Sequence, residues 1–359
     1  MGQHNFVQSS GLFSYSGTEC LRNAYYHNDC RRCIDICPKG AFHIVRNKLT
    51  LFENECIACA ACIGGCPTEA LEVETFDPNA FTAAFRDAEE KQLSCKKNTP
   101  CLGVFDVHHF ITMGLRSETP PSCDMAHCEG CALNVEGAVE ARIRSAIGAA
   151  NRFFFETGYD AEVMTVEEKP EANERRMLFR KAFEKVQEGM AESSPGSSMT
   201  TQHRQSTSKI PLKQLMLKNA LKEKMPELGT TAFASASPVF FAKEISFEAC
   251  TNCGDCVQFC PTEALFATGD KHGINFNAGN CIGCGICEAI CKVDAITTPE
   301  RHDLVAIAYD RTETLVHYEM VQCHECRCPY PYKGGDPVCD RCKDFKSDFS
   351  DMFTLAKDL

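Results

Sequence analysis

The spacing of the cysteines constrains this chain more than any other feature of its sequence. Twenty-six of the 359 residues are cysteine. The spacing Cys-x2-Cys-x2-Cys-x3-Cys occurs three times, and a fourth run keeps only its last three positions. Chance produces such a run rarely, so the fold must be organised around groups of four thiols. The complete runs are Cys56, Cys59, Cys62 and Cys66, then Cys250, Cys253, Cys256 and Cys260, and finally Cys281, Cys284, Cys287 and Cys291.

The altered run precedes the first complete one. It reads Cys30-x2-Cys33-x3-Cys37-Pro, and the cysteine before it is Cys20, with nine residues between Cys20 and Cys30. A run that matches the others needs a fourth thiol, and no closer candidate exists. We therefore expect Cys20 to be a ligand that is reached through a longer loop.

These runs resemble the signature of bacterial ferredoxins, in which thiolates hold 4Fe–4S clusters and the fourth cysteine of each run binds the other cluster. The alternative is zinc or disulfides, but structural zinc sites use two Cys-x2-Cys pairs that lie well apart. The resemblance implies two modules with two cubes each. The implied ligand sets are Cys20, Cys30, Cys33 and Cys66; Cys56, Cys59, Cys62 and Cys37; Cys250, Cys253, Cys256 and Cys291; and Cys281, Cys284, Cys287 and Cys260.

A second group of cysteines lies between the two modules. It comprises Cys95, Cys101, Cys123, Cys128 and Cys131, and helix-period runs at 102–116 and 135–157 accompany it. Strand, helix, cysteine loop and helix make an α/β pattern. The region loosely resembles the delta-type iron–sulfur subunit of hydrogenases, which implies one further iron–sulfur centre. Thiols without metal are the alternative. The nearby His108, His109 and His127 are interpreted as ordinary helix or loop residues.

The last cysteine group has a different spacing. Cys323-x2-Cys326 and Cys339-x2-Cys342 form two pairs with twelve residues between them, as in a zinc ribbon or a rubredoxin. We expect zinc, with iron as the alternative, and Cys328 is left without a role. Ahead of these pairs, the segments 304–309 and 315–321 alternate like the two strands of a hairpin.

Composition and charge limit the class of protein. The formal net charge of −12 argues against a nucleic-acid partner. No apolar window is long enough to span a bilayer, and the first residues show no signal-peptide pattern. With so many free thiols, these features predict a reducing cytoplasm.

The expected fold is α+β, with two ferredoxin-like dicluster modules, a small α/β Cys-rich middle domain and a C-terminal zinc-ribbon-like knuckle. Within the connecting segment, the sequence predicts an amphipathic helix at 171–190 and a flexible linker at 192–209. The segment 212–225 reads as a helix whose lysines form a solvated face or, alternatively, dock an acidic partner. The expected boundaries are 1–76 and 241–300 for the two modules, 77–168 for the middle domain, 169–240 for the connecting segment and 301–359 for the hairpin and knuckle.

The sequence predicts an electron-transfer protein. It contains no flavin, nicotinamide or P-loop fingerprint and no acid–base constellation outside the cysteine loops, so we assign no catalytic residue. As a polyferredoxin it resembles accessory subunits of formate dehydrogenases and hydrogenases, which implies a partner of that class. The alternatives are a thiol or heterodisulfide-type reductase that uses the middle cysteines, and an assembly factor for a redox enzyme.

Overall fold

The computed structural model describes residues 7–9, 13–24, 28–167 and 210–349. The segments predicted as an amphipathic helix (171–190) and a linker (192–209) lie outside these residues. The chain divides into two compact units. Unit 1 comprises Met1–Cys20 and Arg31–Leu217, and unit 2 comprises Leu21–Cys30 and Lys218–Leu359. The second boundary falls inside one helix, α8 (Leu212–Lys224).

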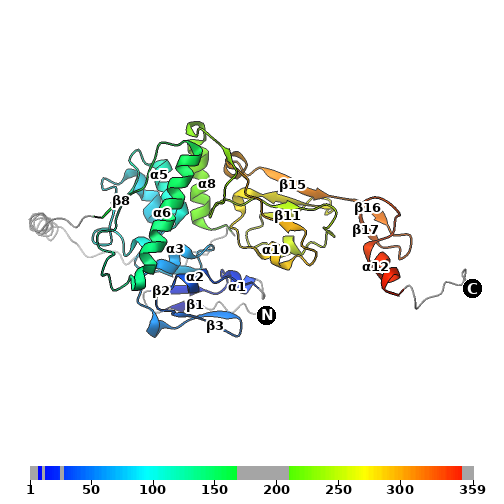
Figure 1. The fold of residues 1–359 in the computed structure, drawn as a ribbon, viewed down its shortest axis with the longest axis horizontal. Coiled ribbons are helices and arrows are strands. Elements are labelled where there is room, and N and C mark those ends of the chain that lie inside the picture. The colour runs from blue at the N-terminus through cyan, green and yellow to red at the C-terminus, as the bar shows by residue number, and fades with distance from the viewer. Residues whose placement is uncertain (1–6, 10–12, 25–27, 168–209, 350–359) are drawn as a thin grey trace, which may run out of the picture. The chain divides into compact units, whose positions relative to one another are not determined.

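The first part of unit 1 is built from small antiparallel sheets. Strands β1 (Val7–Ser9), β2 (Phe13–Ser16) and β5 (Leu71–Val73) form one sheet, and β3 (Phe42–Val45) pairs with β4 (Lys48–Leu51) as a hairpin (Figure 1). The short helices α2 (Arg32–Ile36) and α3 (Ala61–Gly65) each contain one cysteine of a run. The cysteine loops thus lie between the strands of this region.

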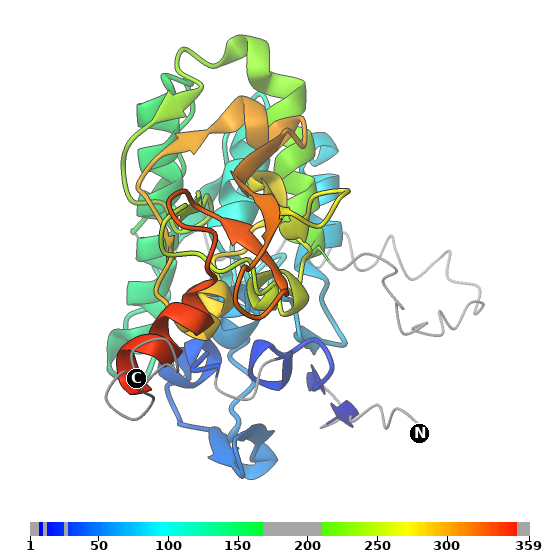
Figure 2. The same ribbon diagram turned by 90° about the vertical axis from the view of Figure 1, so that its right-hand side faces the viewer.

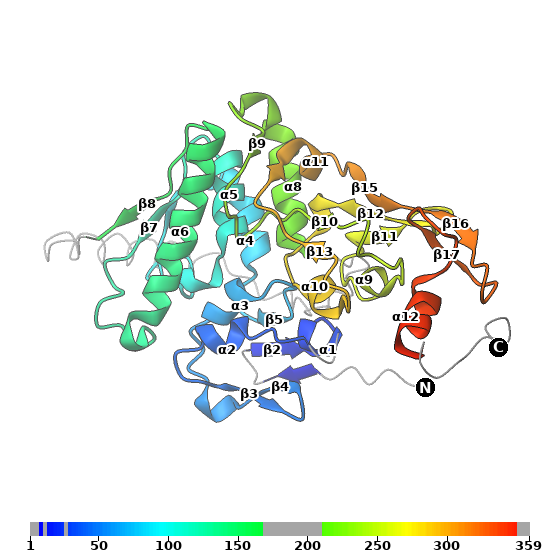
Figure 3. The same ribbon diagram turned by 45° about the vertical axis from the view of Figure 1, so that its right-hand side comes forward.

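The rest of unit 1 is an α/β layer. Strands β6 (Gln92–Leu93), β7 (Ser122–Asp124) and β8 (Met164–Val166) form a parallel sheet. The connections contain 3-10 helix η3 (Leu102–Val104) and helix α5 (Val107–Arg116) before β7, and α6 (Ala138–Thr157) before β8. Figure 3 shows β7 and β8 together beside α6, and α5 packs against α6. The α/β pattern expected for this region is therefore present. α4 (Pro78–Ala84) leads into it.

The helix predicted over 102–116 is interrupted. Asp106 has an extended backbone, and its carboxylate accepts hydrogen bonds from the backbone N–H groups of His108 (2.9 Å) and His109 (3.4 Å). An acidic N-cap of this kind starts a new helix, so α5 begins at Val107. The longer helix α6 ends at Thr157 because Gly158 adopts a left-handed conformation (φ 64°). That stop agrees with the predicted one.

Unit 2 contains the other two complete cysteine runs, which begin at Cys250 and Cys281. Its main sheet has the order β11 (Leu265–Ala267), β12 (Gly273–Asn277) and β15 (Thr312–His317), all antiparallel. β10 (Glu244–Ile245) pairs with β13 (Ile296–Thr297), and β9 (Ala232–Phe233) pairs with β14 (His302–Asp303). Helices α9 (Asp255–Gln258) and α10 (Ile286–Ile290) lie in the cysteine loops, and helix α1 (Leu21–Ala24) belongs to this unit as well.

The hairpin predicted over 304–321 is wrong. Residues Leu304–Ala308 form helix α11, because the Asp303 carboxylate caps it by accepting from the N–H groups of Val305 (2.8 Å) and Ala306 (3.1 Å). β15 pairs with β12 instead of with the 304–309 segment. The true hairpin comes later and joins β16 (Glu319–Gln322) to β17 (Pro329–Tyr332), followed by α12 (Asp340–Phe349) (Figure 2).

The predicted helix at 212–225 is present as α8, but its predicted solvated lysine face is wrong for two residues. Lys213 and Lys218 are both buried. Each ammonium contacts a carboxylate, Lys213 that of Asp106 and Lys218 that of Asp310. These contacts leave the two lysines unable to serve as an exposed docking surface.

In the described residues, no helix is both long enough and apolar enough to cross a bilayer.

Candidate iron–sulfur sites

The three complete cysteine runs fold into the same loop. The residues on either side of the second cysteine have a left-handed backbone in each of them. These residues are Ala58 and Ala60, Asn252 and Gly254, and Gly283 and Gly285, with φ between 53° and 81°. Left-handed residues turn the chain sharply, so that successive thiols face one centre. In the altered run, Asp29 and Arg31 on either side of Cys30 do not have this conformation.

All four runs have the same backbone turn after their fourth cysteine. The residue three positions after it has positive φ: Gly40, Glu69, Glu263 and Asp294, between 47° and 65°. The turn directs a backbone N–H at the thiol, with N···S distances of 3.2–3.5 Å from Ala41 to Cys37, Ala70 to Cys66, Leu265 to Cys260 and Ala295 to Cys291. Such bonds stabilise a thiolate and orient a metal ligand. The altered run therefore keeps this half of the loop.

In unit 2, four thiols line one cavity. It has a volume of about 20 Å³ and is lined by Cys281, Cys284 and Cys287 together with Cys260 from the other run. The ferredoxin resemblance implied this same exchange of the fourth cysteine. Burial raises the pKa of Cys281 to about 12 and that of Cys287 to about 11. Several thiolates can share such a space only when cations such as iron offset their charge, so the donor set fits an iron–sulfur cluster.

The other runs show the same grouping through their charges. Burial raises the pKa of Cys256 to about 12, and the thiols of Cys287, Cys250, Cys253 and Cys291 act on it in the same direction. In unit 1, burial raises the pKa of Cys62, as do Cys59, Cys33, Cys37 and Cys56. Within the expected set of Cys256, the thiols therefore lie within electrostatic range of one another. The same holds within the expected set of Cys62.

The site expected around Cys20 has a buried tyrosine. The hydroxyl of Tyr15 has no nitrogen or oxygen partner among the described residues and faces the thiol of Cys20. Burial, followed by the influence of Cys20, Cys33 and Cys66, raises the pKa of Tyr15. An orphaned hydroxyl among three thiols fits a site for a group with exposed sulfur acceptors.

Cys30 is placed differently from the other members of its expected set. It belongs to unit 2, whereas Cys20, Cys33 and Cys66 belong to unit 1. Within unit 2 it packs with Cys284 and with the buried Leu21, Ile282 and Ile286. Arg22 donates hydrogen bonds to its carbonyl oxygen (3.1 and 3.3 Å). The lengthened loop after Cys20 therefore contributes to the apolar surroundings of Cys284.

Four of the five middle cysteines interact with one another. Cys95 and Cys101 follow β6, while Cys128 and Cys131 follow β7. Burial raises the pKa of Cys128 to about 12, and Glu140 and the other three thiols contribute to the shift. Cys123 lies inside β7, where burial alone raises its pKa to about 12. The structure thus brings four thiols together and leaves Cys123 apart.

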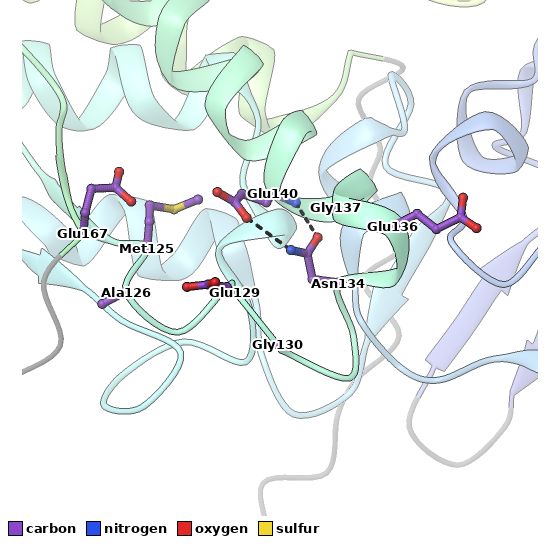
Figure 4. A pocket seen from close by; sticks show the side chains of 9 residues that line it. All are labelled: Met125, Ala126, Glu129, Gly130, Asn134, Glu136, Gly137, Glu140 and Glu167. Carbon is purple, nitrogen blue, oxygen red and sulfur yellow. Dashed lines mark hydrogen bonds between the residues drawn. The ribbon is translucent and has the colours of Figure 1, made fainter.

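An open pocket adjoins this middle group. Figure 4 shows Glu129, Glu136, Glu140 and Glu167 around it, with Gly130 between Cys128 and Cys131 on its lower edge. Arg144 pairs with both Glu140 (2.7 Å) and Glu167 (2.9 Å). Two of the four carboxylates therefore share one guanidinium, which offsets one of their two charges.

Nothing in the sequence indicates that a cation would contact the cysteine loops of unit 1. Arg142 of α6 donates hydrogen bonds to the carbonyl oxygens of Gly103 (2.7 Å) and Phe105 (3.1 Å). Its guanidinium lies against Gly64, since a Cβ there would be 2.4 Å from Nη2. The Lys213 ammonium donates to the carbonyl oxygen of Cys66 (2.6 Å). Only the burial of these side chains, which the sequence does not encode directly, identifies them.

The last four cysteines form a compact tetrad. The sulfurs of Cys323, Cys326, Cys339 and Cys342 all lie within 4.8 Å of one another, and that of Cys326 is 3.7 Å from that of Cys339. A tetrahedral metal with bonds of about 2.3 Å to sulfur has S···S edges of about 3.8 Å. The backbone N–H of Cys328 lowers the pKa of Cys326 to about 6. The tetrad therefore fits a single tetrahedral metal ion.

Comparison with known proteins identifies relatives of the cysteine-rich regions. The family described as 4Fe-4S dicluster domain matches residues 242–292. The chain is 30% identical over 77 residues to the iron–sulfur subunit of an arsenate respiratory reductase from Shewanella sp. (strain ANA-3), covering 21% of this chain and 33% of that protein. It is 41% identical over 61 residues to ferredoxin-1 of Caulobacter vibrioides, covering 16% and 49%. It is 34% identical over 47 residues to a ferredoxin of Methanothermococcus thermolithotrophicus, covering 13% of this chain and 78% of that protein. The chain spans a third of the length of the first of these relatives and about half of the length of the second.

Proposed function

We propose that this chain, which belongs to the ferredoxin-type iron–sulfur proteins, relays single electrons between a redox enzyme and a second carrier through four 4Fe–4S clusters. The observation that carries the proposal is the cavity lined by Cys260, Cys281, Cys284 and Cys287. The loop conformation around it recurs in the other complete runs. A 4Fe–4S cluster supplies one-electron chemistry at low potential.

The ligand sets proposed for the clusters follow the exchanged pattern. Three sets are supported by the grouping of their thiols in the structure. In the first set, Cys20, Cys33 and Cys66 are supported by their common effect on Tyr15. The fourth member, Cys30, is assigned from the sequence spacing alone. The protein's part is to hold each thiol in place and to limit the access of water.

We further propose a fifth iron–sulfur centre at the middle thiols. Cys95, Cys101, Cys128 and Cys131 come from two loops that follow neighbouring parallel strands, so both loops lie at the same edge of the sheet. Cys101 is also within electrostatic range of Cys59. A centre at this position would lie close to the cluster site of Cys59, as an electron relay requires.

The C-terminal tetrad is proposed as a zinc site. Its thiols have the edge length of a tetrahedral ion, and the two knuckles are joined by a loop that contains Gly334 and Gly335. Zinc does not change its oxidation state in proteins, so this site would stabilise the β16–β17 hairpin. Iron in the same tetrad would make it a redox site.

For the partner, we propose the catalytic subunit of a redox enzyme. One relative is named as the iron–sulfur subunit of a reductase, which supports an accessory role. The sequence resemblance favours the formate dehydrogenase or hydrogenase class. The acidic net charge suits transient docking on a basic surface of such a partner.

The decisive experiment is elemental analysis of the anaerobically purified chain together with its redox behaviour. Four clusters predict about 16 iron atoms, a middle centre adds about two to four more, and the tetrad adds one zinc. Dithionite should reduce the protein and an artificial acceptor should reoxidise it. No formate, hydrogen, nicotinamide or disulfide turnover should occur without a catalytic subunit. Fewer than about 12 iron atoms in well-loaded protein, or steady turnover by the chain alone, would overturn the proposal.

A further inference from the structure

The two cluster sites proposed in unit 2 differ in the groups that surround them. Tyr318 lies beside Cys250 at the site of Cys250, Cys253, Cys256 and Cys291. Its hydroxyl donates to the carbonyl oxygens of Phe247 (2.9 Å) and Cys250 (3.3 Å). The charges that act most strongly on Cys256 are those of other cysteines. This site is therefore rich in negative charge.

The other site contains a buried lysine. Lys243, just before β10, lines the cavity together with Cys260, Cys281, Cys284 and Cys287. Among the described residues that line this cavity, Lys243 is the one with a basic or acidic side chain other than a thiol. Its side chain is 3% exposed. The ammonium acts on the thiols of Cys281, Cys284 and Cys287, favouring their charged forms.

A carboxylate and a hydroxyl hold the lysine in place. Its Nζ lies 3.2 Å from Oε1 of Glu288 and also donates to the hydroxyl of Thr298. The Glu288 side chain is 38% exposed, so water screens its charge far more than that of the ammonium. The two charges are equal and opposite, but the ammonium lines the cavity and is the more buried of the two, so the cavity experiences a positive potential from this pair.

The surroundings of Cys284 strengthen that effect. Leu21, Ile282 and Ile286 are buried in one cluster, with Phe259 packed against it. Water is excluded on this side, and charges interact more strongly where the local dielectric constant is low. A cation inside such a wall acts on the cluster site more strongly than one in solvent.

We propose that Lys243 makes the cluster site of Cys281, Cys284, Cys287 and Cys260 the more easily reduced of the two sites in unit 2, so that an electron arriving there stays on it. This rests on the proposed function. Reduction adds one electron from a one-electron donor, such as dithionite, and no bond forms or breaks. The added negative charge is stabilised by an ammonium that is already protonated, so no proton is taken up. Lys243 places a positive charge beside the cluster site and is not one of its ligands.

The test is a redox titration of the full chain, followed by electron paramagnetic resonance under anaerobic conditions. In Lys243→Gln, one titration step should move to more negative potential, with the iron content unchanged. Lys243→Arg keeps the charge and should leave that step close to the wild-type position. Lys271→Gln removes an exposed lysine from the same unit and should move no step. The step that moves should be the one that is lost in Cys284→Ser.

Glu288→Gln provides a test of opposite sign. Removing the carboxylate leaves the ammonium uncompensated, so the same step should move to more positive potential. A purely structural role for Lys243 predicts no such reversal. The proposal is overturned if Lys243→Gln and Lys243→Arg shift the step equally, or if Glu288→Gln shifts it in the negative direction. If Lys243→Gln loses its cluster, the sign found for Glu288→Gln decides. Low iron in the wild-type chain would instead overturn the proposed function.

Discussion

Replacing Asp106 by asparagine tests the buried ion pair that joins α5 to α8 within unit 1. One carboxylate oxygen caps α5, and the other lies 2.5 Å from Nζ of Lys213. The side chains of the lysine and the aspartate are only 4% and 12% exposed. Asparagine can keep an oxygen for the cap, but it replaces the oxygen that faces Lys213 by an amide NH2 group. The substitution therefore removes both the charge and the acceptor of the ion pair and leaves the cap in place.

The expected cost follows from the burial of Lys213. Removing one partner of a buried pair costs about 3–5 kcal/mol, because the remaining charge is left uncompensated. Lys213 keeps its hydrogen bond to the carbonyl oxygen of Cys66, which places the value near the lower end. A loss of about 3 kcal/mol raises the population of the locally opened state roughly a hundredfold.

The effect should depend on pH. Although burial opposes ionisation, the Lys213 ammonium holds the pKa of Asp106 well below its usual range. Stability from a lowered carboxyl pKa is fully present above the pKa of the unfolded chain, about 4, and is lost as the pH falls through the folded value. The difference between wild type and Asp106→Asn should therefore be constant from about pH 5 to 8 and should shrink in acid.

Native-state hydrogen exchange with mass spectrometry, on the anaerobic full chain, measures this opening. Peptides from α5 and from the start of α8 should exchange roughly a hundredfold faster in Asp106→Asn. Asp310→Asn is the matched control, since it also removes the partner of a buried lysine, Lys218. Asp310 is 53% exposed and Lys218 keeps a hydrogen bond to Asn280 (3.0 Å), so the control should cost far less. Unchanged exchange in Asp106→Asn, or an equal effect of Asp310→Asn, would refute the reasoning.

Two further substitutions test the cysteine loops of unit 1. Cys20→Ser should remove or convert one cluster while leaving the resonance signals of the unit 2 clusters intact, and an unchanged iron count would mean that the ligand lies elsewhere. Gly64→Ala places a Cβ 2.4 Å from Nη2 of Arg142 and should cost about 1–3 kcal/mol through overpacking, lowering the melting temperature of the anaerobic protein. Gly148→Ala in α6 meets no atom within 4 Å and should not destabilise; a similar loss there would contradict the packing argument.

Local features of the fold could be predicted because their causes are local. The helix expected at 135–157 is present as α6 from Ala138, and its end is fixed by Gly158. The helix expected at 212–225 is α8. Apolar periodicity and a glycine stop are properties of a short segment, so the sequence alone is sufficient for them.

Two predictions failed for different reasons, one because of distant residues and the other because of a local helix cap. Lys213 and Lys218 are buried because Asp106 and Asp310 lie against them, and these carboxylates are about a hundred residues away in the sequence. The segment at 304–308 is apolar enough for a strand or a helix. The carboxylate of Asp303, which caps the first turn, accounts for the helical outcome.

The middle cysteines show how topology selects among candidates that spacing cannot separate. Cys123 pairs in register with Leu93 of β6, so it lies inside the parallel sheet and is fully buried. The loops that follow β6 and β7 emerge at the same edge, and this brings Cys95 and Cys101 to Cys128 and Cys131. Parallel pairing of two strands about thirty residues apart cannot be deduced from cysteine spacing. Once that pairing is known, four thiols remain as ligands of the proposed fifth centre, and Cys101 is the member that acts on the neighbouring Cys59 loop.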